Sequence, residues 1–366
     1  MATKNEIIPA HPTHPGVLIK DEIDATPHLN QKLLAKLLDV KPSFLNEIIK
    51  GKRPITPDVA VSLEAALGIS AEYWIRFQMQ YEIDLARRKE RNIEKVENIE
   101  KWKSIKEIVP VKYLNKHNYL SETLVEDIEK VLKIYNVATV DEINDEFSCF
   151  EETQSAYYRK SDKLKIDNKN MFTWCALAQY EAKVQQVNDF KFDNIGKLIT
   201  ELNRLFYDNV DTLQQVKSVL NKYGIKFLLI EKLEKTPVDG FTFWSGNNPA
   251  IALTLRHKRI DNFAFTMMHE IGHIDLHLRE DKEQSFIDFT EKTSVGEQED
   301  AANRYAQEQL IPKDVWQRIK NNAMMCDDDI IAIGDAQKIN PAIILERICY
   351  VKNNYARKTK IDKTLR

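Results

Sequence analysis

Apolar residues recur at helical spacing, every three or four positions, through most of this chain. Two such series are Leu124, Ile128, Val131 and Tyr135, and then Trp174, Leu177, Tyr180 and Val184. Three short stretches, residues 225–230, 241–244 and 250–255, instead have the apolar and aromatic composition of strands. The pattern therefore predicts a mainly α protein with a small β-sheet, in the α+β class.

The N-terminal region predicts a group of short helices. Residues 29–39 and 42–50 form two helices around a turn at Val40 and Lys41, and Pro42 suits the first position of the second helix. A third helix over 57–67 ends before Gly68. The expected core residues of the first two helices are Leu33, Leu34, Leu37, Phe44, Ile48 and Ile49. Two helices around a short turn, supported by a third, indicate a helix-turn-helix domain.

Changes in composition divide the chain into three parts. We expect a helix-turn-helix domain at 1–90, a helical linker or adaptor region at 91–200 and a third domain at 201–366. The run 81–106 is rich in Arg, Lys and Glu, which predicts a long solvent-bridging helix. The basic tail 352–366 contains little to bury, so we expect it to be frayed.

The strongest chemical signal is the run His269-Glu270-Ile271-Gly272-His273. Imidazoles four residues apart project from the same face of a helix, and that face can hold a zinc ion. Glu270 follows the first histidine, where its carboxylate can take a proton from the water that attacks a peptide carbonyl. The run predicts His269 and His273 as metal ligands and Glu270 as general base, with solvated surface histidines as the alternative.

A catalytic zinc site needs a third protein ligand. A metzincin-type site would require a histidine at position 279, which is Arg279. The helix predicted at 297–312 places Glu299 on its stripe of small and apolar residues, so this carboxylate points toward the packed side. We expect Glu299 to be the third ligand, with Asp300 and Glu297 as alternatives. An ordinary acidic first turn is the competing interpretation.

The C-terminal part resembles the ImmA/IrrE family of metallopeptidases, which pair H-E-x-x-H with a downstream E-x-x-A-N-x-F-A segment ending in a Leu/Met-Pro turn. Here the second element runs from Glu299 to Pro312, with Tyr305 where Phe is usual, and the likeness covers residues 200–350. The resemblance implies a zincin-like fold and a Zn²⁺ site of His269, His273 and Glu299 with Glu270 as base. It does not establish turnover, because family members often act on one partner protein.

The N-terminal part resembles the HigA-type branch of XRE repressors. The likeness is carried by His14-Pro15-Gly16, by Gly51-Lys52-Arg53-Pro54-Ile55-Thr56-Pro57, and by Ala66-Leu67-Gly68 followed by Glu72-Tyr73-Trp74. The docking geometry of helix-turn-helix proteins then places helix 42–50 in the major groove, with Ser43 and Asn46 as candidate base readers. The residues expected near phosphates are Gln31, Lys41, Lys50, Lys52 and Arg53. An all-helical partner-binding module is the alternative.

Composition sets further limits. A net charge of −3 over 366 residues argues against a protein that coats nucleic acid, so DNA binding must be carried by a local surface. Four scattered cysteines, Cys149, Cys175, Cys326 and Cys349, show neither metal-ligand spacing nor a disulfide framework, and we expect a reducing cytoplasm. No apolar run approaches the ~18 residues of a membrane span, and the N-terminus lacks a signal pattern, so we expect neither insertion nor export.

Together these features predict a DNA-binding head, a helical middle and a zinc-peptidase-like tail, as in fused regulators of toxin–antitoxin loci. We expect a homodimer that binds double-stranded operator DNA, and a zinc-dependent endopeptidase that cleaves a partner protein, or the chain itself, to relieve repression. The alternative is a non-proteolytic antitoxin or repressor that binds a toxin through a degenerate peptidase domain. A third interpretation is a sensor that binds a signal without cleaving anything.

Overall fold

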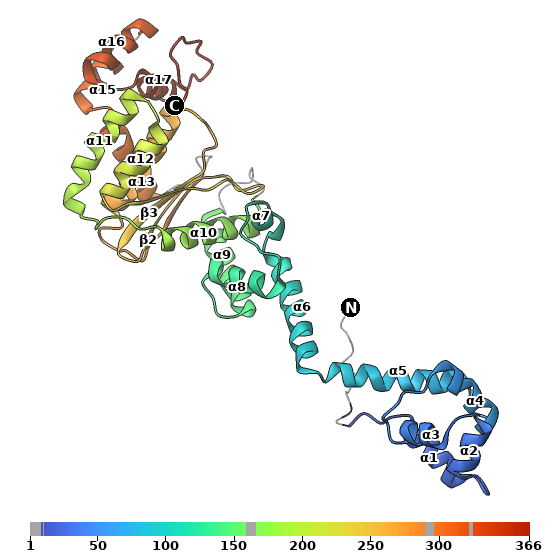
Figure 1. Cartoon of the computed structure of the whole chain (residues 1–366). Helices are drawn as coiled ribbons and strands as arrows, with labels where there is room; N and C mark the ends of the chain where they lie inside the picture. Colours follow the sequence, from blue (N-terminus) through green and yellow to red (C-terminus); the bar gives the residue numbers. More distant parts are fainter. Residues whose placement is uncertain (1–8, 10, 159–165, 290–295, 322–324) are drawn as a thin grey trace. The chain divides into compact units, whose positions relative to one another are not determined.

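The computed structural model describes residues 9, 11–158, 166–289, 296–321 and 325–366, with the side chains of 153–158 excepted, and Figure 1 shows the whole chain. It divides into two compact units, Met1–Lys101 and Trp102–Arg366. The three-part division at residues 90 and 200 stays a prediction. In the described residues the chain is mostly helical with one small sheet, which confirms the predicted mainly α, α+β class.

The first unit is built from five helices and the beginning of a sixth in the described residues. They are α1 (Gly16–Ala25), α2 (Gln31–Leu37), α3 (Pro42–Ile49), α4 (Pro57–Leu67), α5 (Ala71–Arg87) and α6 (Glu90–Ile108). Polar side chains cap two of them: Asn30 accepts a hydrogen bond from the Leu33 N–H at the start of α2, and Thr56 accepts one from Val59 at the start of α4. Gly68 ends α4 with φ of 75°, a left-handed conformation that glycine adopts without strain.

Two expectations for this unit are wrong. Leu33 and Leu37 are 40% and 57% exposed, because α2 turns Leu34, Ala35 and its C-terminal neighbour Leu38 into the core instead. The run 81–106 is also not one helix, since α5 ends at Arg87 and α6 begins at Glu90. The break is stabilised by the Asn92 side chain, which donates a 2.8 Å hydrogen bond to the Ala86 carbonyl near the end of α5.

The start of α1 lies against the end of α3. A Cβ added at Gly16 would lie 2.1 Å from the carbonyl oxygen of Ile48, so only glycine permits this approach. The His14 Nδ1 atom accepts a 2.9 Å hydrogen bond from the Gly16 N–H. The His-Pro-Gly run therefore has a structural role: it sets the contact between α1 and the helix predicted to read DNA.

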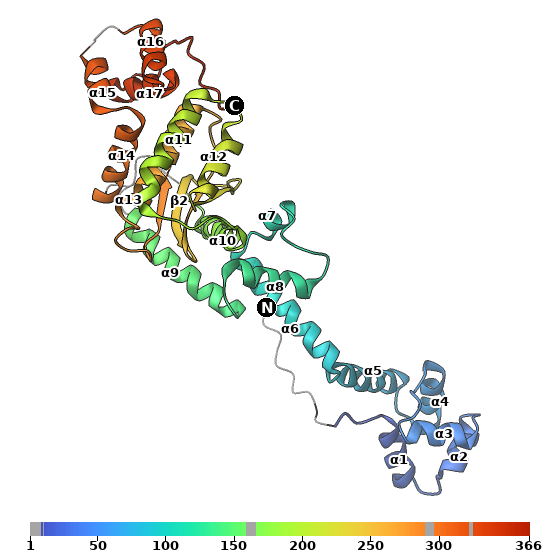
Figure 2. The ribbon, with the colours of Figure 1, turned by 60° about the vertical axis from the view of Figure 1, so that its left-hand side comes forward.

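The second unit places helices on both faces of a four-stranded sheet in its described residues (Figures 1 and 2). The strands are β1 (Lys226–Leu229), β2 (Val238–Ser245), β3 (Asn248–Leu253) and β4 (Phe286–Phe289). The order is β1-β3-β2-β4, with β1 parallel to β3 and the other two pairs antiparallel. The three predicted strands are confirmed, and β4 is an addition that the sequence analysis did not predict.

The helices of this unit divide between the two faces of the sheet. Before the sheet come α7 (Val111–Lys116), α8 (Leu124–Tyr135), α9 (Val140–Tyr158), α10 (Asn168–Val184), α11 (Ile195–Asp208) and α12 (Thr212–Lys222). After β3 come α13 (Ile260–Leu276), α14 (Glu297–Leu310), α15 (Lys313–Lys320), α16 (Asp327–Gln337) and α17 (Pro341–Lys352). On β3, Ala250 and Ala252 pack with the helices around α10, whereas Ile251 and Leu253 pack with the cluster around α13.

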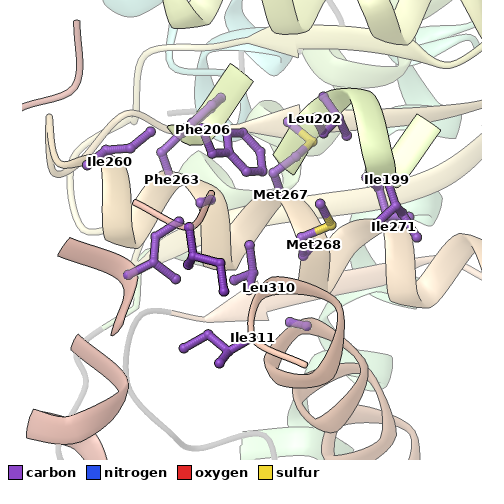
Figure 3. Packing of buried hydrophobic residues seen from close by; sticks show 14 of the residues in the cluster. Ile199, Leu202, Phe206, Ile260, Phe263, Met267, Met268, Ile271, Leu310 and Ile311 are labelled. Carbon is purple, nitrogen blue, oxygen red and sulfur yellow. The ribbon is translucent and has the colours of Figure 1, made fainter. Parts of the chain in front are cut away.

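Helix α13 is buried along nearly its whole length. Figure 3 shows Phe263, Met267 and Met268 of α13 among side chains of α11 and the end of α14. The helix also packs against β2 and α17. A helix held on several sides presents its polar side chains in fixed directions, which is the requirement for a precise site.

The prediction of a frayed basic tail is wrong. Ile361 is buried, and the tail carbonyls of Lys363 and Arg366 accept hydrogen bonds of 2.9 Å and 2.7 Å from the N–H groups of Ile260 and Thr212. The tail is therefore anchored by the apolar side chains of Ile361 and Leu365 and by backbone hydrogen bonds at the starts of α13 and α12. Among the described residues, no helix is long and apolar enough to cross a membrane.

Candidate metal centre and nucleic-acid interface

The two histidines of the H-E-x-x-H run lie side by side in the interior. His269 and His273 are each 1% exposed, and their Nε2 atoms are 3.0 Å apart. Both rings leave α13 on the same face because the residues are four positions apart. The interpretation as solvated surface histidines is excluded by this burial.

Helix α14 brings a carboxylate to the same point. The Glu299 carboxylate oxygens lie 3.3 Å from Nε2 of His269 and 3.5 Å from Nε2 of His273. The helices approach closely because Gly272 faces α14: a Cβ there would lie 3.3 Å from the Ala302 Cα atom. Asp300 and Glu297, the alternative ligands, are exposed in the first turn of α14 and are not part of this cluster.

The cluster of His269, His273 and Glu299 fits a divalent metal ion. Two imidazoles and one carboxylate are the donor set of glutamate-completed zinc sites. Zinc bonds of about 2.0–2.2 Å in tetrahedral geometry hold neighbouring donor atoms about 3.3 Å apart. The observed separations of 3.0, 3.3 and 3.5 Å bracket that value, so the side chains have the spacing that the ion requires.

Two further side chains hold the histidine rings in place. The Nδ1 atom of His269 lies 3.1 Å from Oδ1 of Asn303, and the Nδ1 atom of His273 lies 3.1 Å from Nδ1 of His277. Hydrogen bonds at Nδ1 fix the ring orientation and leave Nε2 as the ligand atom. Asn303 lies four residues after Glu299, and His277 four residues after His273, so helical spacing was the available signal for both.

Glu270 is turned toward the sheet. Its side chain is fully buried, and the Thr242 hydroxyl on β2 donates a 2.5 Å hydrogen bond to Oε2. The other oxygen, Oε1, has no hydrogen-bond partner among the described residues. Gly240 makes room for this carboxylate, because a Cβ there would lie 1.9 Å from Oε1. Glu270 thus occupies a fitted recess beside His269 with one oxygen available for a proton.

Negative charge gathers around His269. Burial lowers the pKa of His273 to about 4. Burial acts on His269 in the same direction, but the bonded Glu299 and the nearby Asp288 and Glu270 outweigh it and raise its pKa to about 9. Burial would raise the pKa of Glu299, but the two histidines outweigh it and lower the pKa to about 2. The raised pKa of His269 thus reflects three acidic side chains gathered around one imidazole.

Asp288 is a site residue that the sequence analysis missed. It lies on β4, and its carboxylate, the Glu270 carboxylate and the His269 ring offer ligand atoms all within 4.8 Å of one another. Burial raises the pKa of both carboxyl groups. No local pattern marks Asp288, because it reaches the cluster only through the pairing of β4 with β2.

In the first unit, the residues expected to meet DNA are distributed around α3. Leu45 and Ile48 of this helix face the core. Ser43, Asn46 and Lys50 follow one another at spacings of three and four, which places them on one face. Of these, Ser43 and Lys50 are exposed and Asn46 is half-buried.

The remaining expected phosphate contacts lie on both sides of α3. Lys41 and Lys52 are exposed, and the amide nitrogen of Gln31 donates a 3.4 Å hydrogen bond to the Pro42 carbonyl. Arg53 lies over the Phe44 ring and forms a 2.9 Å ion pair with Glu47. The lysines therefore present their charge to solvent, whereas the Arg53 charge is partly neutralised.

Two known families match separate parts of the chain. Residues 28–74 match the helix-turn-helix family HTH_3, and residues 221–332 match the Peptidase_M78 family, described as the IrrE N-terminal-like domain. Both resemblances expected from the sequence are thereby confirmed. The second match includes both histidines of α13 and Glu299 of α14.

Individual relatives cover about a quarter of the chain. The virulence-associated protein I of Dichelobacter nodosus is 37% identical over 92 residues, which are 25% of this chain and 82% of that protein. A second relative is the structure of an addiction module antidote protein of a HigA family from Coxiella burnetii, which is 33% identical in sequence with a TM-score of 0.22. The match covers 23% of this chain and 92% of the antidote protein's chain. The structure of Pseudomonas aeruginosa antitoxin HigA with higBA promoter is 30% identical in sequence, with a TM-score of 0.20. The match covers 21% of this chain and 84% of the antitoxin chain.

Removing the clustered ligands is expected to remove metal. Elemental analysis of the purified chain should find about one divalent ion per chain, and a His269→Ala, Glu299→Ala variant should lose it, because a single remaining imidazole holds such an ion weakly. Glu270→Gln is the matched control, since this side chain faces β2, and it should retain the ion. Equal metal content in all three proteins would contradict the assignment of the ligands.

Because Glu270 fills the space beside Gly240, adding a single methyl group at position 240 is expected to destabilise the second unit. Gly240→Ala should lower the free energy of unfolding of the second unit by about 1–3 kcal/mol, because the added Cβ collides with the carboxylate. The unfolding of α13 can be followed by hydrogen exchange of its amides in the full chain. Gly196→Ala on α11 is the control, since a Cβ there meets nothing within 4 Å. If both variants were as stable as the wild type, Glu270 would not occupy this recess.

Proposed function

We propose that this chain, a member of the helix-turn-helix family, is a DNA-binding regulator with a zinc-dependent endopeptidase domain. Its N-terminal domain is similar to HigA antitoxins, and its C-terminal domain is IrrE N-terminal-like. In this proposal the peptidase cleaves a partner protein, or the chain itself, and so relieves repression. The observation that carries the enzymatic part is the buried cluster of His269, His273 and Glu299 with the Glu270 carboxylate beside it.

The side chains of the cluster have complementary tasks. Bound zinc would supply a Lewis acid that polarises the peptide carbonyl. Glu270 accepts a proton from the attacking water at Oε1, the oxygen that has no partner among the described residues, while Thr242 holds Oε2. Asn303 and His277 keep the two rings oriented. The same Glu270 proton is then available to the leaving amine, so one carboxyl group serves both halves of the hydrolysis.

The DNA-binding part of the proposal rests on α3. Its exposed face carries Ser43 and Lys50, and Lys41 and Lys52 flank it, which matches a helix that reads base edges while nearby lysines contact phosphates. Helix-turn-helix proteins commonly bind operators as dimers with one helix per half-site, so we propose a homodimer. We place the protein in the cytoplasm, in keeping with the scattered spacing of its four cysteines.

Replacing Glu270 by Gln is the decisive test of proteolysis. The amide cannot accept the proton, so cleavage of the partner or of the chain should fall by at least 10²-fold, the usual scale of general-base catalysis. Metal content and operator binding should stay at wild-type levels. The readout is derepression of an operator-linked reporter in cells, with cleavage followed by immunoblot.

Full derepression with the Glu270→Gln variant would reject the peptidase. The protein would then be a non-proteolytic antitoxin or repressor that binds a toxin or signal through this domain. The His269→Ala, Glu299→Ala variant shows in the same assay whether the metal ligands are required independently of Glu270.

Substitutions on and beside α3 should separate base reading from phosphate contact. Alanine at Ser43 and Asn46 should relax the preference for operator over random duplex, with about 1–3 kcal/mol lost per base contact. Alanine at Lys52 should weaken binding to all duplexes and reduce the salt dependence by about one ion. Fluorescence anisotropy at several salt concentrations measures both effects. Unchanged binding in both variants would refute this docking.

A further inference from the structure

A cavity of about 470 Å³ lies beside the metal-ligand cluster in the second unit. Asn303, which contacts Nδ1 of His269, lines this cavity. Asp288 lines it as well, and its carboxylate is within 4.8 Å of the ligand atoms of His269 and Glu270. A polypeptide bound at the cluster would therefore have a side-chain pocket nearby, reached past Asp288 and Asn303.

The walls of the cavity combine aromatic and acidic side chains. Its aromatic residues are Phe265, Phe289, Tyr350 and Tyr355. In the described part of the chain, its acidic residues are Asp239, Asp261, Asp288, Asp300 and Glu346, against one basic residue, Arg347. This lining is unlike an ordinary apolar specificity pocket, in which polar groups are few.

Some of these charges are already used by the fold. Asp261 and Glu346 share the Arg259 guanidinium, at 2.6 Å and 2.7 Å, and Lys363 approaches both. Arg347 donates to the backbone carbonyls of Gln307 and Ile311 and lies over the Trp316 ring. Among the described residues, the cation that lines the cavity thus donates to backbone oxygens.

Of the other three carboxylates, Asp288 and Asp300 are the two that we assign to a ligand. Within the described ranges, neither Asp288 nor Asp300 forms an ion pair with a lysine or arginine. Asp300 is exposed, so it marks the open side of the cavity, whereas Asp288 is half-buried beside His269.

We propose that this cavity binds a basic side chain, arginine or lysine, of the polypeptide that lies across the His269 cluster. The long apolar stem of such a side chain packs on the aromatic walls, and its charged end meets Asp288 and Asp300. Aromatic faces beside the carboxylates add cation–π attraction. The inference rests on the proposed function only in that the occupant is a polypeptide, and it holds for a cleaved substrate and for a bound partner alike.

The test uses the full chain with the Glu270→Gln substitution, loaded with zinc so that bound peptides stay intact. The probes are hexapeptide amides of alanine and leucine with one arginine at each position in turn, and matched peptides with neutral citrulline instead. At one position, arginine should bind at least tenfold more tightly than citrulline in isothermal titration calorimetry. Equal affinity at every position, or no binding by any probe, would overturn the proposal.

Variants assign the preference to the cavity. Asp288→Asn with Asp300→Asn should bring the arginine-to-citrulline ratio close to one. The matched control, Asp141→Asn with Asp145→Asn on the exposed side of α9, removes the same charge and should keep the ratio at tenfold or more. A ratio that falls equally in both double variants would indicate general electrostatic attraction and would reject a specific pocket.

Hydrolysis of the same peptides by the wild-type chain separates this inference from the peptidase proposal. Arginine-selective binding without hydrolysis supports the cavity and counts against proteolysis. Hydrolysis without arginine selectivity supports proteolysis and rejects the cavity as a basic subsite.

Discussion

The burial of α13 is the constraint on which the rest of the second unit depends. This helix carries His269, Glu270 and His273 into an interior with almost no exposure to solvent, where each ionisable group is costly unless it is paired. The neighbouring elements supply the partners: α14 brings Glu299 and Asn303, and β2 brings Thr242. The polar site and the apolar core thus depend on the same elements, because the elements that bury the helix also provide the groups that stabilise its polar face.

Close approach of backbone to side chain is the second shared device. Gly272 lets α14 lie against α13, Gly240 admits the Glu270 carboxylate, and Gly16 lets α1 lie against α3. In each case the missing side chain leaves a space that a functional element fills. These glycines therefore affect function through geometry, although none of them takes part in chemistry.

Sequence reasoning reached the parts that are encoded locally. The H-E-x-x-H spacing located two clustered side chains, and the stripe of α14 located Glu299, because both depend on helical periodicity alone. Sequence reasoning failed for Asp288, because the position of this residue depends on a strand pairing across more than forty residues. It also failed for Leu33 and Leu37, because periodicity shows that a helix has an apolar face but not how wide the buried part of that face is. The tail was misjudged because much of its anchoring comes from backbone hydrogen bonds, which composition does not reveal.

That anchoring has a consequence for the order of folding during synthesis. The N–H of Ile260, at the start of the metal-ligand helix, receives its partner from Lys363, a residue made about one hundred positions later. The N-terminal unit has a core of its own and can fold on the ribosome as soon as it emerges. The second unit gains its last backbone partners only when residues 361–366 have left the exit tunnel. The nascent chain is therefore able to form its helix-turn-helix domain before its IrrE N-terminal-like domain is complete.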